Sequence, residues 1–316
     1  MSSTALRRAS GVLGPRAVPD APLGARTTYR VGGCASLLLV AEDDDDLVLA
    51  ARAAEASAVT VLVVGKGSNL LVADAGFSGL AVVLGSAFSG VDLEPDGSRV
   101  RCGGAVDLPV VARRTAAAGL RGLEWAVGVP GSVGGGVRMN AGGHGSDVAA
   151  HLRRVRVLDL ATGQDGVMAA DDLRLGYRRS SLTPSQVVVW AEFELEPGDA
   201  EEARAEVAEV VRWRRAHQPG GQNAGSVFTN PPDDSAGRLV ELAGCRGLRL
   251  GTAQVSTKHA NFIQSEPGGS ADDVLALIAE VRRRVVAATG VLLEPEVRLV
   301  GPGGSGYGVG YGVASP

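Results

Sequence analysis

Two glycine-rich loops have the composition of an anion-binding backbone. The first, 65–69 (GKGSN), directly follows the β-branched apolar run 59–64 (VTVLVV). Two glycines allow successive N–H groups to turn toward one point and bind a phosphate. The loop is not a P-loop, because Thr60 occupies the leading glycine position, and not a dinucleotide fingerprint, because Leu70 occupies the third. A purely structural turn is the alternative.

The second loop, 128–136, continues to Gly143 and is the most glycine-dense stretch outside the C-terminal tail. So many glycines argue against a helix. Pro130 fixes one backbone φ angle, and neighbouring apolar residues such as Trp125 and Val127 would anchor the segment. We therefore expect an irregular loop of defined shape. A flexible linker is the alternative, although linkers are more often rich in serine and poor in apolar residues.

One arginine lies in a pattern suited to binding a carboxylate. Arg178 belongs to the segment 176–181 (GYRRSS). Its planar guanidinium can donate two parallel hydrogen bonds to a carboxylate. Because surface arginines are common and usually solvated, the segment by itself fits an exposed arginine equally well.

Two further side chains could donate a proton or stabilise charge. Ser226 lies in the sequence NAGSVFTNP, and the chain has no G-x-S-x-G elbow, so we expect a hydroxyl donor rather than an acylated serine. A late strand is predicted at 293–298 (LEPEVR), where alternation places Glu296 on the same face as Glu294 and Arg298. A solvated strand face carrying an ion pair is the alternative.

No metal site or disulfide framework is predicted. The histidines have neither HExxH spacing nor a cysteine partner, and the cysteines form no CxxC pair. These residues are His144, His151, His217, His259, Cys34, Cys102 and Cys245.

The elements that must position these residues alternate between helices and strands. Apolar periodicity and capping residues predict helices at 47–58, 108–118, 200–215 and 272–288, the last with Ser270 as N-cap. Apolar runs predict strands at 59–64, 80–84, 100–102, 152–160 and 186–195. A polar hairpin is expected at 95–97, and small polar residues predict flexible tails at 1–20 and 301–316.

Composition limits the class of protein. The chain has 316 residues, enough for two or three compact units at roughly 100–200 residues each. A formal net charge of −4 argues against a nucleic-acid partner, and 45% hydrophobic residues exclude a disordered chain. No apolar run approaches the ~18 residues of a membrane span, and no apolar stretch follows the N-terminal arginines as in a secretory signal. We expect a soluble, cytoplasmic monomer without a membrane partner.

Six motifs occur in an order that closely resembles the UDP-N-acetylenolpyruvoylglucosamine reductases, also called UDP-N-acetylmuramate dehydrogenases. The motifs are 65–71, 128–145, 176–181, 223–231, 254–263 and 293–298. The resemblance extends over residues 20 to 301. It implies an α+β fold: a two-part FAD-binding domain of the vanillyl-alcohol-oxidase type (21–90 and 91–197) and a C-terminal α/β substrate domain (198–300).

The resemblance also implies an activity. A non-covalently bound FAD would take hydride from NADPH and reduce the enolpyruvyl group of UDP-N-acetylglucosamine enolpyruvate to UDP-N-acetylmuramate, an early step of peptidoglycan synthesis. Ser226 would supply the proton, while Arg178 and Glu296 would stabilise the developing enol. Glu296 would have to be protonated, or hydrogen-bonded through a neighbour, to help an anion.

The remaining site residues follow from the same resemblance. Those expected to contact FAD are Gly65, Lys66, Gly67, Ser68, Asn69, Leu70, Gly128, Pro130, Gly131, Ser132, Gly134, Gly135 and Asn140. Those expected to contact the substrate are Tyr177, Asn230 and Asn261.

The sequence departs from the family pattern in three places. No tyrosine occurs between Tyr177 and Tyr307, so the chain resembles the subtype without the tyrosine-bearing insertion loop. Thr229 replaces a common lysine, and His144 replaces a common tyrosine. Two other functions stay open on the residues alone: a flavin-dependent oxidase or dehydrogenase of a small alcohol, and a glycine-rich binding protein without a cofactor.

Overall fold

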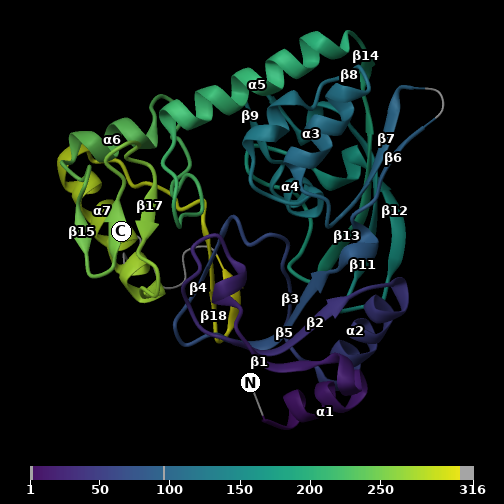
Figure 1. Cartoon of the computed structure of the whole chain (residues 1–316). Helices are drawn as coiled ribbons and strands as arrows, with labels where there is room; N and C mark the ends of the chain where they lie inside the picture. The colour runs from purple at the N-terminus through teal and green to yellow at the C-terminus, as the bar shows by residue number, and fades with distance from the viewer. Residues whose placement is uncertain (1–2, 95–96, 307–316) are drawn as a thin grey trace. The chain divides into compact units, whose positions relative to one another are not determined.

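The structure, a computed structural model, describes residues 3–94 and 97–306 and divides into two compact units (Figure 1). The first unit comprises the chain up to Val18, Leu37–Lys66 and Leu80–Ala216. The second unit comprises Pro19–Ser36, Gly67–Gly79 and the chain from His217 onward. These bounds differ from the predicted ranges 21–90, 91–197 and 198–300, because the chain leaves each unit and returns to it.

One sheet has four strands in the order β1-β2-β5-β3. The strands are β1 (Val18–Ala21), β2 (Ala35–Ala41), β3 (Val61–Val63) and β5 (Phe77–Leu84). β3 and β5 are parallel, with Leu62 opposite Ala81. The predicted helix at 47–58 is confirmed as α2 (Asp44–Ser57), which begins earlier because the Asp43 side chain accepts a hydrogen bond from the Asp46 N–H.

The predicted flexible tail at 1–20 is wrong for the residues that the structure describes. Helix α1 (Ser3–Leu13) lies beside α2 in Figure 1 and packs against it. Leu6, Ala9 and Leu13 form an apolar stripe at helical spacing, and the last two are buried in a core shared with α2. The arginines, serine and glycine between them hide this stripe from a composition-based prediction.

The first unit also contains a five-stranded antiparallel sheet in the order β12-β11-β13-β7-β6. The strands are β6 (Val91–Leu93), β7 (Arg99–Gly103), β11 (Leu152–Asp159), β12 (Asp165–Ala169) and β13 (Gln186–Glu194). The predicted strands at 100–102, 152–160 and 186–195 are thus confirmed. Inward residues such as Val100, Val155 and Phe193 share one core with helix α3 (Leu108–Ala117), the helix predicted at 108–118. β6 and β7 form the predicted hairpin, although residues 95–96 of its turn lie outside the described residues.

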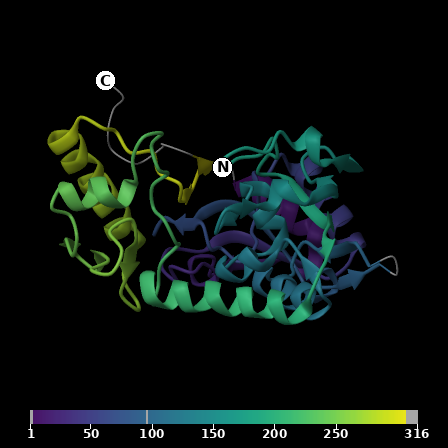
Figure 2. The ribbon, with the colours of Figure 1, turned by 90° about the horizontal axis from the view of Figure 1, so that it is seen from above.

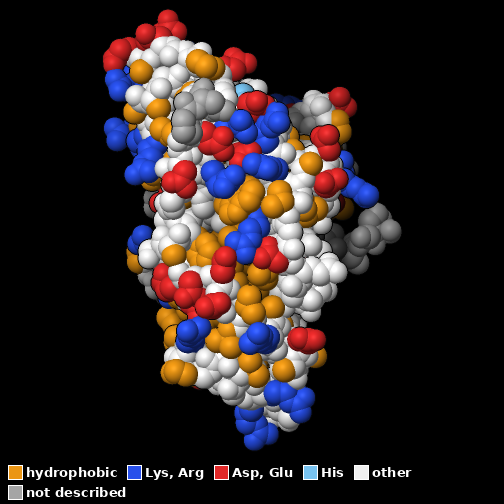
Figure 3. Space-filling model, turned by 90° about the vertical axis from the view of Figure 1, so that its right-hand side faces the viewer, with side chains coloured by type: hydrophobic (Ala, Val, Ile, Leu, Met, Phe, Trp, Pro, Cys, Tyr) orange, Lys and Arg blue, Asp and Glu red, His pale blue; other side chains and the backbone are white. Residues whose placement is uncertain are grey.

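The other face of this sheet carries paired charges. Glu192, whose side chain is 2% exposed, accepts hydrogen bonds from Arg101 at 2.9 Å and from Arg154 at 2.8 Å. The two arginines are its partners across β7 and β11. Figure 3 shows basic and acidic side chains next to each other at several places on the side of the molecule where these strands lie.

The prediction that 128–136 is not helical is wrong for the last residues of this segment. Residues Val133–Met139 form helix α4, in which the Ser132 side chain caps the N-terminus by accepting a hydrogen bond from the Gly135 N–H. The glycines allow close packing, because a Cβ at Gly134 would lie 3.1 Å from the Gly104 carbonyl oxygen and one at Gly136 3.1 Å from a Leu108 methyl. Tertiary packing therefore compensates for low helix propensity.

Helix α5 (Ala200–His217), predicted at 200–215, is one continuous helix (Figure 2). Ala203, Val207 and Val210 are buried in the core of the five-stranded sheet, so residues up to Ala216 belong to the first unit rather than to a separate substrate domain. Two short antiparallel pairs complete this unit: β8 (Leu120–Arg121) with β14 (Glu196–Pro197), and β9 (Gly142–Gly143) with β10 (Ser146–Asp147).

The second unit packs helices and two small sheets around one core. Its helices are α6 (Ala236–Leu242) and α7 (Ala271–Thr289). Its sheets are β15-β16-β17 (Arg249–Leu250, Ala253–Val255, Ile263–Ser265) and β19-β18-β4 (Gly304–Gly306, Arg298–Gly301, Leu70–Val72). The helix predicted at 272–288 is confirmed as α7, and Ser270 caps it by accepting from the Asp273 N–H at 3.2 Å.

Two predictions near the C-terminus need correction. A regular strand begins only at Arg298, because Glu296 pairs through isolated hydrogen bonds instead of a continuous ladder. Residues 301–306 are not a flexible tail, since Gly304–Gly306 pairs antiparallel with β18; the rest of the predicted tail, 307–316, lies outside the described residues. None of the helices within 3–94 and 97–306 has the length and apolarity of a bilayer-spanning segment.

Candidate active site

The first glycine-rich loop presents its backbone amides. The N–H groups of residues 65–69 donate no hydrogen bond to any residue that the structure describes. Gly67 has a φ of +62°, and a Cβ there would lie 2.6 Å from the Cα of Thr27. The Gly67 carbonyl instead accepts from the Thr28 N–H at 3.2 Å, which fixes the turn. Free, successive N–H groups in a fixed turn can bind an anionic oxygen.

The start of this loop lies against the second glycine-rich segment. Gly65 lies two residues after β3, and a Cβ at this position would lie 2.5 Å from the Ser132 Oγ. The Lys66 Nζ is 2.8 Å from an Asp107 carboxylate oxygen, with both side chains about half exposed, and Asp107 forms a bridge with Ser132. The structure thus brings Gly65, Lys66 and Ser132 together, as a shared ligand would require.

The start of α4 is not itself a phosphate site. The Val133 N–H donates to Val106 at 2.8 Å, the Gly134 N–H donates to Gly104 at 2.9 Å, and Ser132 caps the N–H of Gly135. These amides are therefore already used within the protein. Of the other predicted residues here, Pro130 and Gly135 are exposed, whereas the Gly131 carbonyl accepts from the Leu108 N–H at 2.8 Å.

Asn140 connects α4 to the arginine segment. It ends the helix with a φ of +40° and is 4% exposed. Its side-chain nitrogen donates to Asp147 at 2.9 Å and to the Gly176 carbonyl at 3.2 Å, and its oxygen accepts from the Ala149 N–H at 2.9 Å. Both ends of the amide are occupied, so Asn140 positions the Gly176 turn.

Arg178 lies in a tight turn. Gly176 and Arg179 exchange both main-chain hydrogen bonds at 3.0 and 3.1 Å, and Arg178 between them has a φ of +56°. Its guanidinium lies 5.7 Å from the ring centre of Tyr177, a side chain that is 63% exposed. Ser180 then donates to the Arg138 carbonyl at 2.6 Å and anchors the turn on α4. An arginine and an exposed aromatic ring are thus held side by side.

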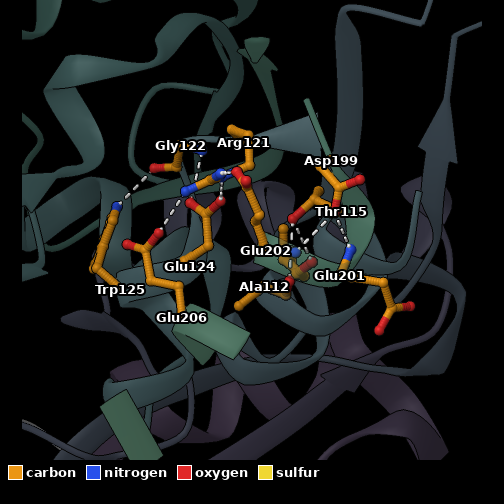
Figure 4. A network of polar contacts seen from close by, with 11 residues as sticks. Ala112, Thr115, Arg121, Gly122, Glu124, Trp125, Asp199, Glu201, Glu202 and Glu206 are labelled. Carbon is orange, nitrogen blue, oxygen red and sulfur yellow. Dashed lines mark hydrogen bonds and ion pairs between the residues drawn. The ribbon is translucent and has the colours of Figure 1, made fainter. Parts of the chain in front are cut away.

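An ion-pair network connects helix α5 to residues 121–124, which precede the second glycine-rich segment (Figure 4). Arg121 lies 2.6 Å from Glu124, 2.6 Å from Glu206 and 3.3 Å from Glu202. The hydrogen bond that Arg121 donates to Glu124 raises the pKa of Arg121 above its usual value. Glu124 also accepts from the Gly122 N–H at 2.7 Å, so the chain leading toward Gly128 is fixed at this point.

A second attachment of α5 reaches Gly128 itself. The Arg214 guanidinium donates to the Gly128 carbonyl, and burial lowers the pKa of Arg214. A Cβ at Gly128 would lie 3.1 Å from a Val210 methyl. His144 meets Trp213 edge-on, with ring centres 5.0 Å apart. This face of α5 therefore fixes the shape of the predicted cofactor loop.

In the second unit, Ser226 leads into a segment held by Asn261. Asn261 is 4% exposed, and its side chain accepts from the Phe228 N–H at 3.0 Å and donates to the Phe228 carbonyl at 2.8 Å. Its main-chain carbonyl accepts from the Val227 N–H at 2.8 Å. The Ser226 hydroxyl, which is partly exposed, forms no hydrogen bond with any described residue and can donate its proton elsewhere.

Glu296 lies directly across from this segment. Its N–H donates to the Val227 carbonyl at 2.7 Å, and the Thr229 N–H donates to the Glu294 carbonyl at 2.9 Å. Leu293 and Val297 are buried whereas Glu294 is exposed and Glu296 partly so, so the predicted alternation of faces holds without a regular strand. The structure thus brings Ser226 and Glu296, 70 positions apart in the sequence, onto paired neighbouring segments.

The other predicted residues are distributed between the units. Asn230 is exposed, and its side-chain oxygen accepts from the Ala236 N–H at 3.0 Å at the start of α6. Arg178 and Tyr177 belong to the first unit, and Ser226, Glu296, Asn230 and Asn261 belong to the second. Ser68 lies in the loop with the free amides, and Leu70 is the first residue of β4.

Sequence reasoning missed the residues that hold the site residues in place. Asp107, Asp147 and Arg214 contact Lys66, Asn140 and Gly128, respectively. No local pattern distinguishes Asp107 and Asp147 from surface charges. Only Arg214 carries a signal, since it lies four residues after the buried Val210 on the same face of α5. Among the described residues, no group of three or more His, Cys, Asp or Glu side chains could hold a metal ion.

Comparison with known proteins decides the family. A reductase from Heliobacterium modesticaldum named UDP-N-acetylenolpyruvoylglucosamine reductase is 43% identical over 286 residues, which are 90% of each chain. The chain belongs to the UDP-N-acetylenolpyruvoylglucosamine reductase family. A reductase of the same name from Rubrobacter xylanophilus is 42% identical over 289 residues, 91% of this chain and 96% of that one. The predicted family is confirmed.

Two family models match separate parts of the chain, and a solved structure matches most of it. The C-terminal domain of UDP-N-acetylenolpyruvoylglucosamine reductase matches residues 217–300, and an FAD binding domain matches residues 35–164. The crystal structure of the reductase from Thermus caldophilus has a TM-score of 0.77 at 36% identity and covers 90% of this chain and 97% of that one. The predicted α+β fold, an FAD-binding part followed by the reductase family's C-terminal domain, is confirmed.

Proposed function

We propose that this protein uses NADPH and non-covalently bound FAD to reduce the enolpyruvyl group of UDP-N-acetylglucosamine enolpyruvate to UDP-N-acetylmuramate in peptidoglycan synthesis. Membership of the reductase family supports this activity. The observation that carries the mechanism is the pairing of the Ser226 segment with Glu296, since the Glu296 N–H donates to Val227 at 2.7 Å. We further propose that the enzyme works as a cytoplasmic monomer.

The residues of the glycine-rich segments fit FAD. The free amides of 65–69, with Lys66 beside them, suit a diphosphate, and the crowding at Gly65 shows a backbone that approaches its neighbours without room for a side chain. The exposed Pro130 and Gly135 suit contact with a flat ring. When bound there, FAD would supply hydride transfer from NADPH to the methylene carbon of the substrate.

Side chains of the protein would stabilise the negative charge that forms on the substrate and supply the proton that is added to it. Addition of hydride to the methylene carbon places negative charge on the adjacent carbon and its carboxylate. Arg178 binds that carboxylate through charge-assisted hydrogen bonds, and Glu296 stabilises the enol. Ser226 donates its hydroxyl proton to the carbon, which completes the addition of two hydrogens across the double bond, and the serine oxygen then regains a proton from solvent.

Two of the proposed ligand contacts change role. The amides of Asn140 and Asn261 are engaged by the protein's own chain, so we assign them to positioning the Gly176 turn and the Ser226 segment. Tyr177 and Asn230 stay proposed substrate contacts, because both are exposed. We also assign the chain to the subtype without a tyrosine-bearing insertion, since β13 begins five residues after Ser181.

A spectrum and an anaerobic titration test this proposal. The purified protein should show flavin absorption, NADPH should bleach it, and UDP-N-acetylglucosamine enolpyruvate should restore it without oxygen. A folded, colourless protein that takes up no FAD would remove both the reductase and any other flavoenzyme. Rapid reaction with oxygen and no response to the enolpyruvyl substrate would favour a small-alcohol oxidase instead.

A further inference from the structure

Asn69 is the residue at which the free-amide loop joins the Glu296 segment. Its carbonyl accepts from the Arg298 N–H at 3.0 Å, next to the parallel pairing of Leu70 with Arg298 that begins the β4–β18 ladder. Its side-chain nitrogen donates to the Glu296 carbonyl at 3.1 Å, a contact between residues 227 positions apart. The hydrogen bond from the Asn69 side chain therefore continues the pairing of the two strands by one more contact, where a main-chain N–H would otherwise donate.

Both main-chain groups of Glu296 are consequently held from opposite sides. Its N–H donates to Val227 at 2.7 Å, next to Ser226, and its carbonyl accepts from Asn69, at the end of the 65–69 loop. Asn69, Val227 and Glu296 all belong to the second unit, and Glu296 is hydrogen-bonded to both of the others. A shift of the Asn69 side chain would thus act on the backbone of Glu296 directly, without any intervening residue.

We propose that Asn69 is a positioning residue that ties the conformation of the 65–69 loop to the placement of Glu296. This inference rests on the proposed function, in which the loop binds FAD and Glu296 acts on the substrate. An anion bound by the loop amides fixes the loop, and the Asn69 amide passes that constraint to the carbonyl of Glu296. Cofactor binding then completes the arrangement of the Ser226 and Glu296 segments.

Substitutions at Asn69 separate this coupling from cofactor binding itself. Asn69→Ala removes the side-chain donor and keeps the main-chain N–H that would face the anion. Asn69→Asp has nearly the same shape but presents a carboxylate to the Glu296 carbonyl, so the contact becomes repulsive. Gln254→Ala is the matched control, because Gln254 also donates a side-chain amide to a main-chain carbonyl, that of Gly247 at 3.2 Å, in the same unit.

The test is amide hydrogen exchange of the full-length chain with and without FAD. In the wild-type protein and in Gln254→Ala, FAD should slow exchange of the Glu296 and Arg298 amides by about 10-fold or more, a measurable change for locally opened amides. In Asn69→Ala and Asn69→Asp, FAD should still bind, as its spectrum reports, but the slowing at Glu296 should be lost. The kcat of both variants should fall about 10-fold while the KM for NADPH changes less than about 2-fold.

Each outcome has a distinct meaning. Asn69 variants that bind FAD and keep the full slowing at Glu296, or that keep wild-type kcat, would overturn the positioning role alone. A wild-type chain that takes up no FAD would overturn the proposed function together with the coupling. Should Asn69→Ala fail to fold, the same measurement can be made on Asn69→Asp and Asn69→Ser, because both variants keep a polar side chain no larger than that of asparagine.

Discussion

Gly65 and Ser132 meet at the point where the two glycine-rich segments touch, and a Cβ on Gly65 would lie 2.5 Å from the Ser132 Oγ. That oxygen already caps α4 through the Gly135 N–H. The contact explains why glycine is required at this position although Gly65 does not have a positive φ. A local turn cannot account for it, since the crowding comes from a residue 67 positions away.

Gly65→Ala should therefore destabilise the protein and weaken FAD binding. The methyl group must displace the Ser132 hydroxyl, which costs about 1–3 kcal/mol of unfolding free energy. Denaturant unfolding and a flavin titration measure both effects. Gly166→Ala is the control, because a Cβ there meets nothing within 4 Å. Equal stability of the two variants would contradict the proposed crowding.

Ser226→Ala should lower turnover by at least about 10²-fold, the scale of a lost general acid. FAD affinity should change little, because the Ser226 hydroxyl forms no hydrogen bond with any described residue. Steady-state kinetics with the enolpyruvyl substrate and a flavin titration provide the measurement. Ser226→Cys retains a proton donor and should recover part of the lost activity. Near-wild-type turnover in Ser226→Ala would remove this hydroxyl from the mechanism.

Arg178→Lys should lower kcat by about 10–10²-fold, the scale of a lost charge-stabilising donor. A lysine ammonium is a point charge and cannot replace the two parallel hydrogen bonds of a guanidinium. Arg179→Lys is the matched control, since Arg179 is the next residue of the same turn and is exposed. Similar kinetics for both variants would contradict the role assigned to Arg178.

The pairing of Glu192 with two arginines should make stability depend on pH. Hydrogen bonds from Arg154 and Arg101 lower the pKa of Glu192. Because the folded pKa lies below the unfolded one, the stabilisation is fully present above the unfolded pKa and is lost as the pH falls through the folded one.

Glu192→Gln should accordingly lose about 1–2 kcal/mol at pH 7 and differ less from the wild type below about pH 4. Urea unfolding over this pH range measures the difference. Glu201→Gln serves as a control, because the Glu201 side chain is 82% exposed and its ion pair contributes little. A deficit for Glu192→Gln that is as large at pH 3 as at pH 7 would rule out the ionic contribution.

The cysteines should differ sharply in reactivity. Cys34 is exposed, whereas burial raises the pKa of Cys102 to about 12 and also raises that of Cys245. Since the thiolate is the reactive species, iodoacetamide at pH 8 should label Cys34 in the folded protein and leave Cys102 unmodified. Peptide mass spectrometry locates the label. Labelling of Cys102 at the rate of Cys34 would contradict its burial in the first unit.

The sequence by itself determined the elements whose signals are local. The apolar periodicity of α3, α5 and α7 and the capping Ser270 are properties of neighbouring residues, so these helices were predictable. The order of the glycine-rich, arginine and serine motifs likewise identified the family. Helix α1 was mispredicted because its apolar stripe is short and interrupted by arginine, serine and glycine.

Only the tertiary structure decided which distant residues meet and which polar groups remain available. The helical state of the glycine-rich α4 depends on packing against Gly104 and Leu108. The side-chain amides of Asn140 and Asn261 are hydrogen-bonded to the carbonyls of Gly176 and Phe228, which lie 36 and 33 positions away, so the positioning roles that we propose for them could not be foreseen. A side-chain amide has a fixed number of donors and acceptors, and the fold, not the neighbouring residues in the sequence, decides which groups occupy them.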